Sequence, residues 1–272
     1  MNTNFIEWPR AQYWEKCWNP WIGCHACSPA CSNCYANTLA HRFGMSFRPH
    51  ATKQITPPRS GVVFCGNMTD LFGYWMLTKY QCYLIDKTLG HSETATYLWL
   101  TKRPRRMMKA LQDGIMRTPN GGLVPFHDCV FGNQYFGMTV ENQDWFENRF
   151  GAFLLKPNWA KCWLSAEPLL GPINLHLDFY DDLPMDRNLP YQWVVVGCES
   201  GPYRRPCKLE WVENLVYQCV THNIPVFVKQ LDICGKCVTD ITKFPKHLQI
   251  RQVPWVHTFF QSNAVDRVAS LP

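Results

Sequence analysis

Residues 161–167 read Lys161-Cys162-Trp163-Leu164-Ser165-Ala166-Glu167, an apolar run that ends in polar side chains. A continuous apolar run is typical of a parallel strand buried on both faces, because an exposed face would show alternating polar residues. Polar side chains that directly follow such a strand lie at its carboxyl end, where βα barrels build their active sites. The stretch therefore predicts a buried parallel strand that leads into a functional site.

The same pattern recurs along the chain and alternates with helix-like segments. The further strand-like runs are 62–65, 97–100, 135–138, 193–196 and 226–228, and the helix-like segments are 70–89, 103–111, 141–155 and 208–221. This alternation predicts parallel βα units with right-handed crossovers. We expect an α/β fold, a partial (βα)6-type barrel that is TIM-like, with parallel strands and with or without one additional strand. An open doubly wound sheet is the alternative, but no GxGxxG or GxxxxGK[ST] motif accompanies it.

Polar residues also follow the other predicted strands. These segments are 67–70, 101–103, 139–142, 199–200 and 229–230. Strands end in polar residues wherever loops are hydrated, but six ends rich in acids, amides and lysines favour one shared site. Lys102, Glu167, Glu199 and Lys229 are its candidate catalytic residues.

The composition describes a folded chain without a membrane segment. Hydrophobic residues make up 46% of the 272 residues, which is enough for a sizeable core. No stretch approaches the roughly 18 consecutive apolar residues of a membrane span, and segment 1–10 lacks the apolar run of a signal peptide. We expect one domain over residues 1–272, located in the cytoplasm and without a membrane partner.

The positive charge is moderate and leaves the partner open. A net charge of +6 is compatible with a nucleic-acid partner but does not require one. The densest basic patch is 102–106, with Lys109 following it. A solvated helix start and a phosphate-binding surface explain this patch equally well.

Cysteines are concentrated in one short loop. Of the 14 cysteines, five fall between Cys17 and Cys34, and the loop 24–34 contains two adjacent CX2C pairs. Soft thiolates select zinc or iron–sulfur clusters. A structural zinc site usually takes its ligands from two separated pairs, so pairs this close fit it poorly. Three cysteines from one loop suit a cubane, because they bind three irons and leave the fourth open for a substrate.

The spacing Cys27-x3-Cys31-x2-Cys34 is similar to that of the radical S-adenosylmethionine superfamily. This resemblance implies a 4Fe–4S cluster whose open iron binds the amino and carboxylate groups of S-adenosylmethionine. An electron from the cluster then cleaves the sulfonium and gives a 5′-deoxyadenosyl radical, with a protein such as flavodoxin or ferredoxin as the electron donor. The protein's part in such chemistry is to position the cofactor and to exclude side reactions.

A longer resemblance covers residues 18 to about 254. The chain resembles a phage and prophage radical-SAM-like family of unknown function, and its most specific matching segments are LTKRP (100–104) and LSAEPLLGP (164–172). The family's three cysteines, in a CX6CX2C pattern, correspond to Cys24, Cys31 and Cys34, which we expect to bind the metal. Cys27 is the competing third ligand, because the superfamily spacing selects it instead. A phage origin implies the cytoplasm of a bacterial host.

The superfamily resemblance also implies a cofactor site. Asn67 and Asp70 are expected near the methionine amino group, and Glu141 and Asn142 near the ribose. Carboxylates suit these roles because they accept hydrogen bonds from ammonium and hydroxyl groups. Ser165 completes the predicted cofactor-binding set.

Three later cysteines have no assigned role. Cys198 stands where the resembling family usually has glycine, so it adds a thiol beside the predicted site. Cys234 and Cys237 form a CX2C pair, which indicates either part of a second metal site or a surface turn.

Three functions are compatible with these observations. The first is a radical S-adenosylmethionine enzyme, of the lyase, isomerase or transferase type, that modifies or rearranges a hypermodified or damaged nucleobase in phage DNA. The second is the same chemistry on a free metabolite or peptide. The third is a non-enzymatic, metal-stapled nucleic-acid-binding protein, which would not need acids and lysines at six strand ends. We expect the first, with DNA or a nucleotide as the substrate.

Overall fold

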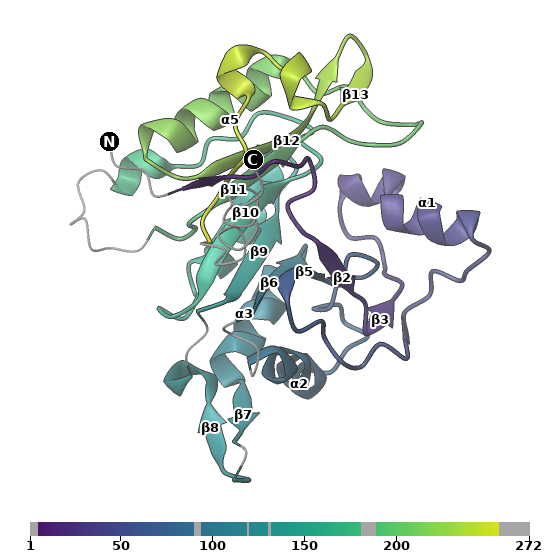
Figure 1. The fold of residues 1–272 in the computed structure, drawn as a ribbon, viewed down its shortest axis with the longest axis vertical. Helices are drawn as coiled ribbons and strands as arrows, with labels where there is room; N and C mark the ends of the chain where they lie inside the picture. The colour runs from purple at the N-terminus through teal and green to yellow at the C-terminus, as the bar shows by residue number, and fades with distance from the viewer. Residues whose placement is uncertain (1–4, 90–93, 119, 130–131, 181–188, 256–272) are drawn as a thin grey trace, which may run out of the picture.

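A computed structural model describes residues 5–89, 94–118, 120–129, 132–180 and 189–255. Its centre is an eight-stranded sheet with the order β13-β12-β11-β10-β9-β6-β5-β2 (Figure 1). In chain order its strands are β2 (Lys16–Trp18), β5 (Gly61–Cys65), β6 (Ala95–Thr101), β9 (Gln134–Thr139), β10 (Lys161–Ala166), β11 (Val194–Gly197), β12 (Val226–Ile233) and β13 (Lys236–Val238).

Neighbouring strands of this sheet are parallel, except that β12 and β13 form an antiparallel hairpin. The sheet curls into a half-barrel (Figure 1), so the predicted α/β class and a mostly parallel partial barrel are confirmed. Each of the six predicted apolar runs overlaps one of its strands, and Trp193 of run 193–196 falls outside, directly before β11. Every residue of β5, β9 and β11 is buried, as expected for parallel strands covered on both faces.

Four of the five α-helices in the described residues correspond to predicted segments. The helices are α1 (Tyr35–Arg42), α2 (Thr78–Leu89), α3 (Pro104–Asp113), α4 (Gln143–Phe153) and α5 (Leu209–Thr221). The helix predicted from Asp70 begins only at Thr78, because the Asp70 carboxylate accepts hydrogen bonds from the Phe72 N–H and the Thr101 hydroxyl. Those contacts favour turns over a helix between residues 70 and 77.

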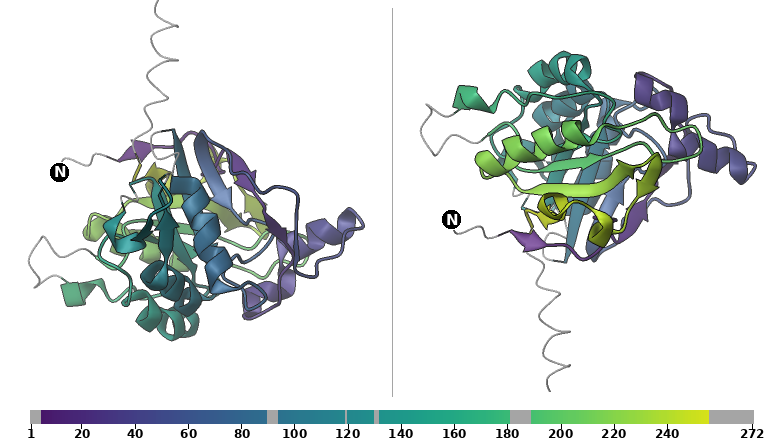
Figure 2. Two further views of the ribbon diagram at one scale, coloured as in Figure 1. Left: turned by 90° about the horizontal axis from the view of Figure 1, so that it is seen from below. Right: turned by 90° about the horizontal axis from the view of Figure 1, so that it is seen from above.

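Two apolar layers cover the two faces of the sheet. Alternate residues of each strand point to opposite faces. Val63 of β5 therefore packs with the helices, and Val62 packs with Trp8, Tyr13 and other residues of the N-terminal segment. Viewed from above, α5 and the N-terminal strand lie on opposite sides of the sheet (Figure 2). The concave face is thus filled by aromatic side chains, and the open space of the barrel remains at the strand ends.

The remaining elements are short and connect or close the barrel. β1 (Ile6–Glu7) pairs with β14 (Gln252–Val253), β3 (Trp21–Ile22) with β4 (His50–Ala51), and β7 (Ile115–Arg117) with β8 (Leu123–Pro125). The 3-10 turns are η1 (Pro29–Asn33), η2 (Phe126–Asp128), η3 (Leu177–Tyr180), η4 (Ile241–Lys243) and η5 (Lys246–Leu248). The cysteine loop ends in η1, and α1 follows it directly.

The structure bears on two further expectations. Among the described residues, no helix has both the length and the apolar character that crossing a membrane requires. The single domain predicted over residues 1–272 includes segments 1–4 and 256–272, which lie outside the described residues. The domain assignment therefore stays a prediction.

Candidate active site

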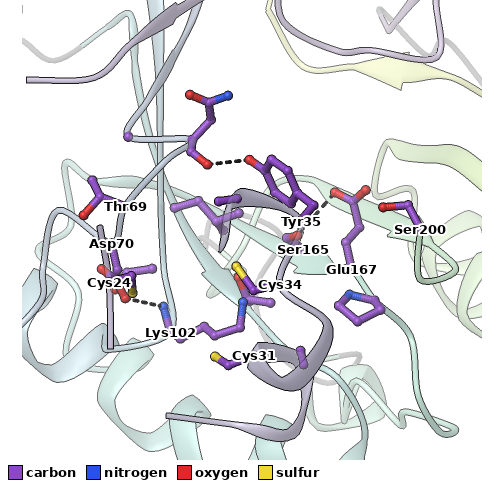
Figure 3. Close-up of a pocket in the computed structure, with 18 of the residues that line it drawn as sticks. Cys24, Cys31, Cys34, Tyr35, Thr69, Asp70, Lys102, Ser165, Glu167 and Ser200 are labelled. Carbon is purple, nitrogen blue, oxygen red and sulfur yellow. Dashed lines mark hydrogen bonds between the residues drawn. The ribbon is translucent and has the colours of Figure 1, made fainter. Parts of the chain in front are cut away.

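A cavity of about 420 Å³ lies at the carboxyl ends of the parallel strands (Figure 3). All four cysteines of the loop line it: Cys24, Cys27, Cys31 and Cys34. The remaining wall includes residues at the carboxyl ends of β5, β6, β9, β10 and β11, and Lys229 and Gln230 of β12, where the parallel pairing with β11 stops. The cysteine loop and the strand ends therefore share one cavity, whose volume is within the range of about 300–1,000 Å³ typical of small-molecule sites.

The cysteine loop surrounds the Cys31 sulfur with hydrogen-bond donors. The Cys27 backbone N–H lies 3.5 Å from the Cys31 Sγ, and the Ser28 Oγ lies 3.7 Å from it. The Cys27 thiol also donates to this sulfur and, with a smaller contribution from Lys102, lowers the pKa of Cys31 to about 4. The same hydrogen bond, together with burial, raises the pKa of Cys27. The loop is thus arranged to hold Cys31 as a thiolate, the form that binds metals.

Cys24 enters the cavity from the other end of the loop. Its backbone N–H donates to the Phe47 carbonyl, and the preceding Gly23 has a φ of +92°. A side chain at Gly23 would collide with the Arg48 backbone, so only glycine permits this close approach. Burial raises the pKa of Cys24 to about 11. Cys24 therefore differs from Cys31, because at Cys24 burial outweighs the hydrogen bonds from the Arg103 side chain and the Asp70 backbone that favour the thiolate.

The loop cysteines do not converge on one point. Among the described residues, no three His, Cys, Asp or Glu side chains are close enough together to hold a single metal ion. A cubane makes a different demand, because each thiolate binds its own iron and the sulfurs must surround a shared space. Four cysteines around one cavity, one of them held as a thiolate, fit that demand.

Three pairs of charged residues hold the cysteine loop against the barrel. The first pair is Asp70, after β5, and Arg103, at the start of α3, whose buried side chains lie 2.9 Å apart. Arg103 also donates to the His25 carbonyl at 2.7 Å, so it binds the loop between Cys24 and Cys27. Asp70 is fully engaged, because it also accepts hydrogen bonds from the Lys102 N–H and the Thr101 hydroxyl.

The second pair lies beneath the middle of the loop. Glu141, which follows β9, is completely buried and lies 2.7 Å from Arg149 of α4. Its other oxygen accepts a 2.5 Å hydrogen bond from the Ser28 hydroxyl. Because Ser28 also contacts the Cys31 sulfur, the buried carboxylate helps to place the donors around that thiolate.

The third pair contacts the end of the loop. Glu199, after β11, forms an ion pair with Arg205 and accepts a hydrogen bond of 2.9 Å from the Asn33 side chain. Arg205 also donates to the Pro29 carbonyl at 3.0 Å. Burial alone would raise the pKa of Glu199, but the hydrogen bonds from Arg205 and Asn33 lower it. Glu199 is therefore held as a carboxylate that fixes η1.

A fourth polar group, the Lys229–Glu167 pair, also lines the cavity. The Lys229 Nζ lies 2.8 Å from the Glu167 Oε1, and the Tyr13 hydroxyl donates to the Glu167 Oε2 at 3.0 Å. Trp14 packs beneath the same ammonium group, whose nitrogen lies 5.3 Å from the ring centroid. Lys229 is 24% exposed, so this ion pair remains accessible from the cavity. Figure 3 shows Glu167 and Ser165 across the cavity from Cys24.

Most of the predicted site residues line this cavity, with two exceptions. The wall includes the following predicted residues: Asn67, Asp70, Lys102, Ser165, Glu167, Glu199 and Lys229. Glu141 and Asn142 are not part of it. Glu141 is engaged by Arg149 and Ser28, and Asn142 caps α4 by accepting the Trp145 N–H. Their predicted contact with a ribose stays a prediction, and both would first have to leave these partners.

Several residues that complete the site are not among those predicted from the sequence. Tyr13 and Trp14 lie in an N-terminal segment without periodicity, so only their aromatic character marked them. Arg149 gave a readable signal, because it is a charged residue on the otherwise apolar face of α4. A buried arginine of this kind requires a carboxylate partner, and Glu141 was the nearest acid at a strand end.

The remaining predicted features lie elsewhere. Cys234 is exposed at the turn between β12 and β13, whereas Cys237 of β13 contacts Cys198. The basic patch after β6 is divided: Arg106 donates to the Phe72 and Met76 carbonyls, and Lys109 pairs with Asp113. Arg106 therefore has a structural role, and Arg105 keeps an exposed side chain.

Comparison with known proteins identifies the family of the chain. A family model described as protein of unknown function (DUF5131) matches residues 6–249. The matched region extends from β1 through η5 and contains the cysteine loop and every residue that lines the cavity. No curated protein and no solved structure matches the chain. Because the match covers most of the sequence, the chain belongs to the family described as protein of unknown function (DUF5131).

Proposed function

We propose that the chain is a radical S-adenosylmethionine enzyme that acts on a nucleobase. The observation that carries this proposal is the shared cavity, in which four loop cysteines meet polar side chains from six strand ends. A metal-stapled binding module would have no use for an accessible lysine–glutamate pair in the same cavity. The arrangement favours an enzyme, because titratable groups that converge beside a metal-binding loop are typical of active sites.

The cysteine loop supplies the ligands for the cofactor. Cys24, Cys31 and Cys34 would hold a 4Fe–4S cluster, with Cys27 as the alternative to Cys24. Such a cluster would supply the electron for the reductive cleavage of S-adenosylmethionine. The chain's own contribution is to hold the loop: Arg103 binds it at the His25 carbonyl, and Glu141 binds it at the Ser28 hydroxyl. Lys102 adds positive charge near Cys31, which favours its thiolate.

The opposite wall of the cavity suits a flat, polar substrate. Tyr13, Trp14 and Phe64 give it aromatic surface, on which a nucleobase could stack. The Lys229 ammonium is positioned to donate a hydrogen bond or a proton from Nζ to a ring oxygen or nitrogen. Glu167 stabilises that charge at 2.8 Å, and the Tyr13 hydroxyl fixes the carboxylate from its other oxygen. These three residues would orient the base.

The same proposal includes the fold type, the location and the electron donor. The barrel would be of the (βα)6 type. The protein would act in the cytoplasm of a bacterial host, and flavodoxin or ferredoxin would supply the electron. A base in DNA would have to be single-stranded or flipped out, because a radical formed in a cavity does not reach into stacked base pairs. The resemblance to a phage family and the net charge of +6 support DNA over other substrates.

The cofactor part is tested by anaerobic reconstitution with iron and sulfide. We expect reduced, reconstituted protein to convert S-adenosylmethionine into 5′-deoxyadenosine, measured by liquid chromatography and mass spectrometry. The Cys31→Ala variant should form none, whereas Cys219→Ala, which changes a buried thiol of α5 outside the cavity, should retain the reaction. If the protein holds stoichiometric zinc and no iron or sulfide, the radical S-adenosylmethionine hypothesis is excluded.

The substrate part is tested separately by DNA binding. We expect single-stranded DNA to bind more tightly than duplex, with affinity that falls steeply with salt because phosphate contacts release counterions. Replacing the exposed Arg105 and Lys109 by glutamine should reduce the salt slope by roughly one unit per lost phosphate contact. Absence of DNA binding at low salt, with 5′-deoxyadenosine formation intact, would point to a free nucleotide or another metabolite.

A further inference from the structure

Two cysteines outside the cysteine loop lie in direct contact. The Cys198 and Cys237 sulfurs are 3.7 Å apart, although the residues are 39 positions apart in the sequence. Cys198 directly follows β11, and Cys237 lies in β13. The nearer sequence neighbour, Cys234, is exposed at the hairpin turn with a φ of +49°. The CX2C spacing indicates Cys234 as the partner of Cys237, but in the tertiary structure its partner is Cys198.

The two sulfurs of this pair face different surroundings. Cys198 is only 2% exposed, and it forms part of the cavity wall. Cys237 is partly exposed and does not line the cavity. The pair thus extends from the wall of the proposed active site toward the surface of the β12–β13 hairpin. A reagent from solution reaches Cys237 first.

Hydrogen bonds to β12 hold both cysteines in place. The Cys198 N–H donates to the Gln230 carbonyl, and the Gln230 side chain donates back to the Cys198 carbonyl at 2.6 Å. Cys237 is fixed by its register opposite Asp232 in the antiparallel hairpin. Because both cysteines are bound to β12, their sulfurs stay in contact without help from a metal or ligand.

We propose that Cys198 and Cys237 form a reversible dithiol–disulfide site that exchanges with small disulfides of the glutathione type. The Cys237 thiolate attacks one sulfur of oxidised glutathione, forms a mixed disulfide and releases one glutathione thiolate. The Cys198 thiolate then attacks the Cys237 sulfur, closes the protein disulfide and releases the second glutathione. Two protein thiols are oxidised, one glutathione disulfide is reduced to two thiols, and the two thiol protons pass to the released thiolates.

The order of these steps follows from access. Cys237 reacts first because it is the more exposed sulfur, and an attacking thiol needs access to the disulfide. Burial and the neighbouring Cys237 raise the pKa of Cys198, so Cys198 is a poor nucleophile toward reagents in solution. It acts well as the resolving thiol, because its target sulfur is already in contact. Oxidation would remove a thiol from the cavity wall and join the hairpin to the end of β11.

Tryptic mapping tests this pairing directly, because trypsin places the relevant cysteines on separate peptides. Cys198 falls in 188–204, Cys207 in 205–208, Cys234 in 230–236 and Cys237 in 237–243. The full-length protein is equilibrated anaerobically in buffers of decreasing ratio of reduced to oxidised glutathione, then quenched with N-ethylmaleimide and digested. We expect peptides 188–204 and 237–243 to become linked, and the two thiols to disappear over the same range of ratios.

Matched variants distinguish the proposed pair from other thiol chemistry. Cys207→Ser, at a buried neighbour, should leave the link intact, whereas Cys237→Ser should leave Cys198 reduced throughout. A disulfide between Cys234 and Cys237 would overturn the proposal. It would also be overturned if Cys198 stayed reduced under conditions in which glutathione already modifies Cys234. Zinc retained on the two cysteines and protecting them from glutathione would also overturn it. The readout does not depend on iron, so it is independent of the proposed radical chemistry.

Discussion

The cysteine loop and the Cys198–Cys237 pair bring sulfur to one cavity, but different forces hold them. Side-chain contacts hold the loop, from Arg103 at His25, from Glu141 at Ser28, and from the Glu199–Arg205 pair at η1. Cys198 directly follows β11, Cys237 lies in β13, and hydrogen bonds to the intervening strand β12 hold both of them. Because the loop is held at separate points, its sulfurs stay apart and surround a space. The hydrogen bonds to β12 instead bring the two sulfurs of the pair into contact.

This difference indicates two kinds of sulfur chemistry. Thiols that surround a space suit an external group that binds several of them at once. Thiols in mutual contact need no external group, because they can bond to each other. The loop therefore depends on a few buried charges, and the pair depends on the sheet. Each prediction below changes one side of this comparison.

The largest effect is expected from the loop cysteines that both spacing patterns share. Anaerobically reconstituted protein should hold about four iron per chain, as one cubane requires. Cys31→Ala or Cys34→Ala should abolish iron binding, measured by iron and sulfide analysis, because each removes a ligand. Cys198→Ala should retain full iron. Iron loss in the Cys198→Ala protein would mean that the cysteine loop and the Cys198–Cys237 pair form one site. It would contradict the distinction between two kinds of sulfur chemistry.

The next prediction separates the two candidates for the third ligand. Cys24→Ala should lose the cluster, whereas Cys27→Ala should retain iron at a reduced level, because Cys27 supports Cys31 through a hydrogen bond. Iron content and the visible absorption spectrum of the two variants, prepared side by side, measure this. The reverse result would show that Cys27, as the superfamily spacing selects, is the ligand.

A buried charge beneath the loop should have the largest effect on stability. Glu141→Ala leaves Arg149 buried without its partner, and breaking a buried pair in this way costs about 3–5 kcal/mol in free energy of unfolding. Urea denaturation of the metal-free protein measures it. Glu147→Ala, at an exposed residue of the helix α4 that carries Arg149, should stay within about 0.5 kcal/mol of the unchanged protein. A loss below about 1 kcal/mol for Glu141→Ala would mean that the loop is not held there.

The smallest effect concerns the contact at the end of the loop and its dependence on pH. Glu199→Gln weakens the hydrogen bonds from Arg205 and Asn33, and should lower the free energy of unfolding by about 1–2 kcal/mol at neutral pH. The pKa of Glu199 is lower in the folded than in the unfolded protein, where it is about 4.3. Its contribution is therefore complete above that value and is lost as the pH falls through the folded pKa.

Urea denaturation between pH 3 and pH 7 tests this dependence. The difference between Glu199→Gln and the unchanged protein should be constant above about pH 5 and should shrink at more acidic pH. Glu210→Gln, at an exposed residue of α5, should show no such change. If the difference in free energy of unfolding grew as the pH fell, its pH dependence would have the opposite sign. Glu199 would then not be a charged contact that stabilises the loop.

The apolar runs and the cysteine spacing were readable because they are local properties. A run such as Val194–Val196 predicts a buried strand whatever its neighbours are, since burial on both faces requires apolar residues throughout. Four helices followed in the same way, although α2 begins later because Asp70 bonds to the turn that precedes it. The two-residue strands β1 and β14 were not predictable, because two residues carry no periodicity.

The sequence by itself therefore determined that the chain folds as parallel βα units and that four of its cysteines gather in one loop near the N-terminal end of the sheet. Only the tertiary structure decided which partners meet. Glu141 binds Ser28 across 113 positions of sequence, Tyr13 binds Glu167 across 154, and Cys237 contacts Cys198 instead of Cys234. Such pairs depend on how the sheet curls and on which buried charges must be neutralised. Both are properties of the packed chain, because a charge in the interior is stable only where a partner from another segment reaches it.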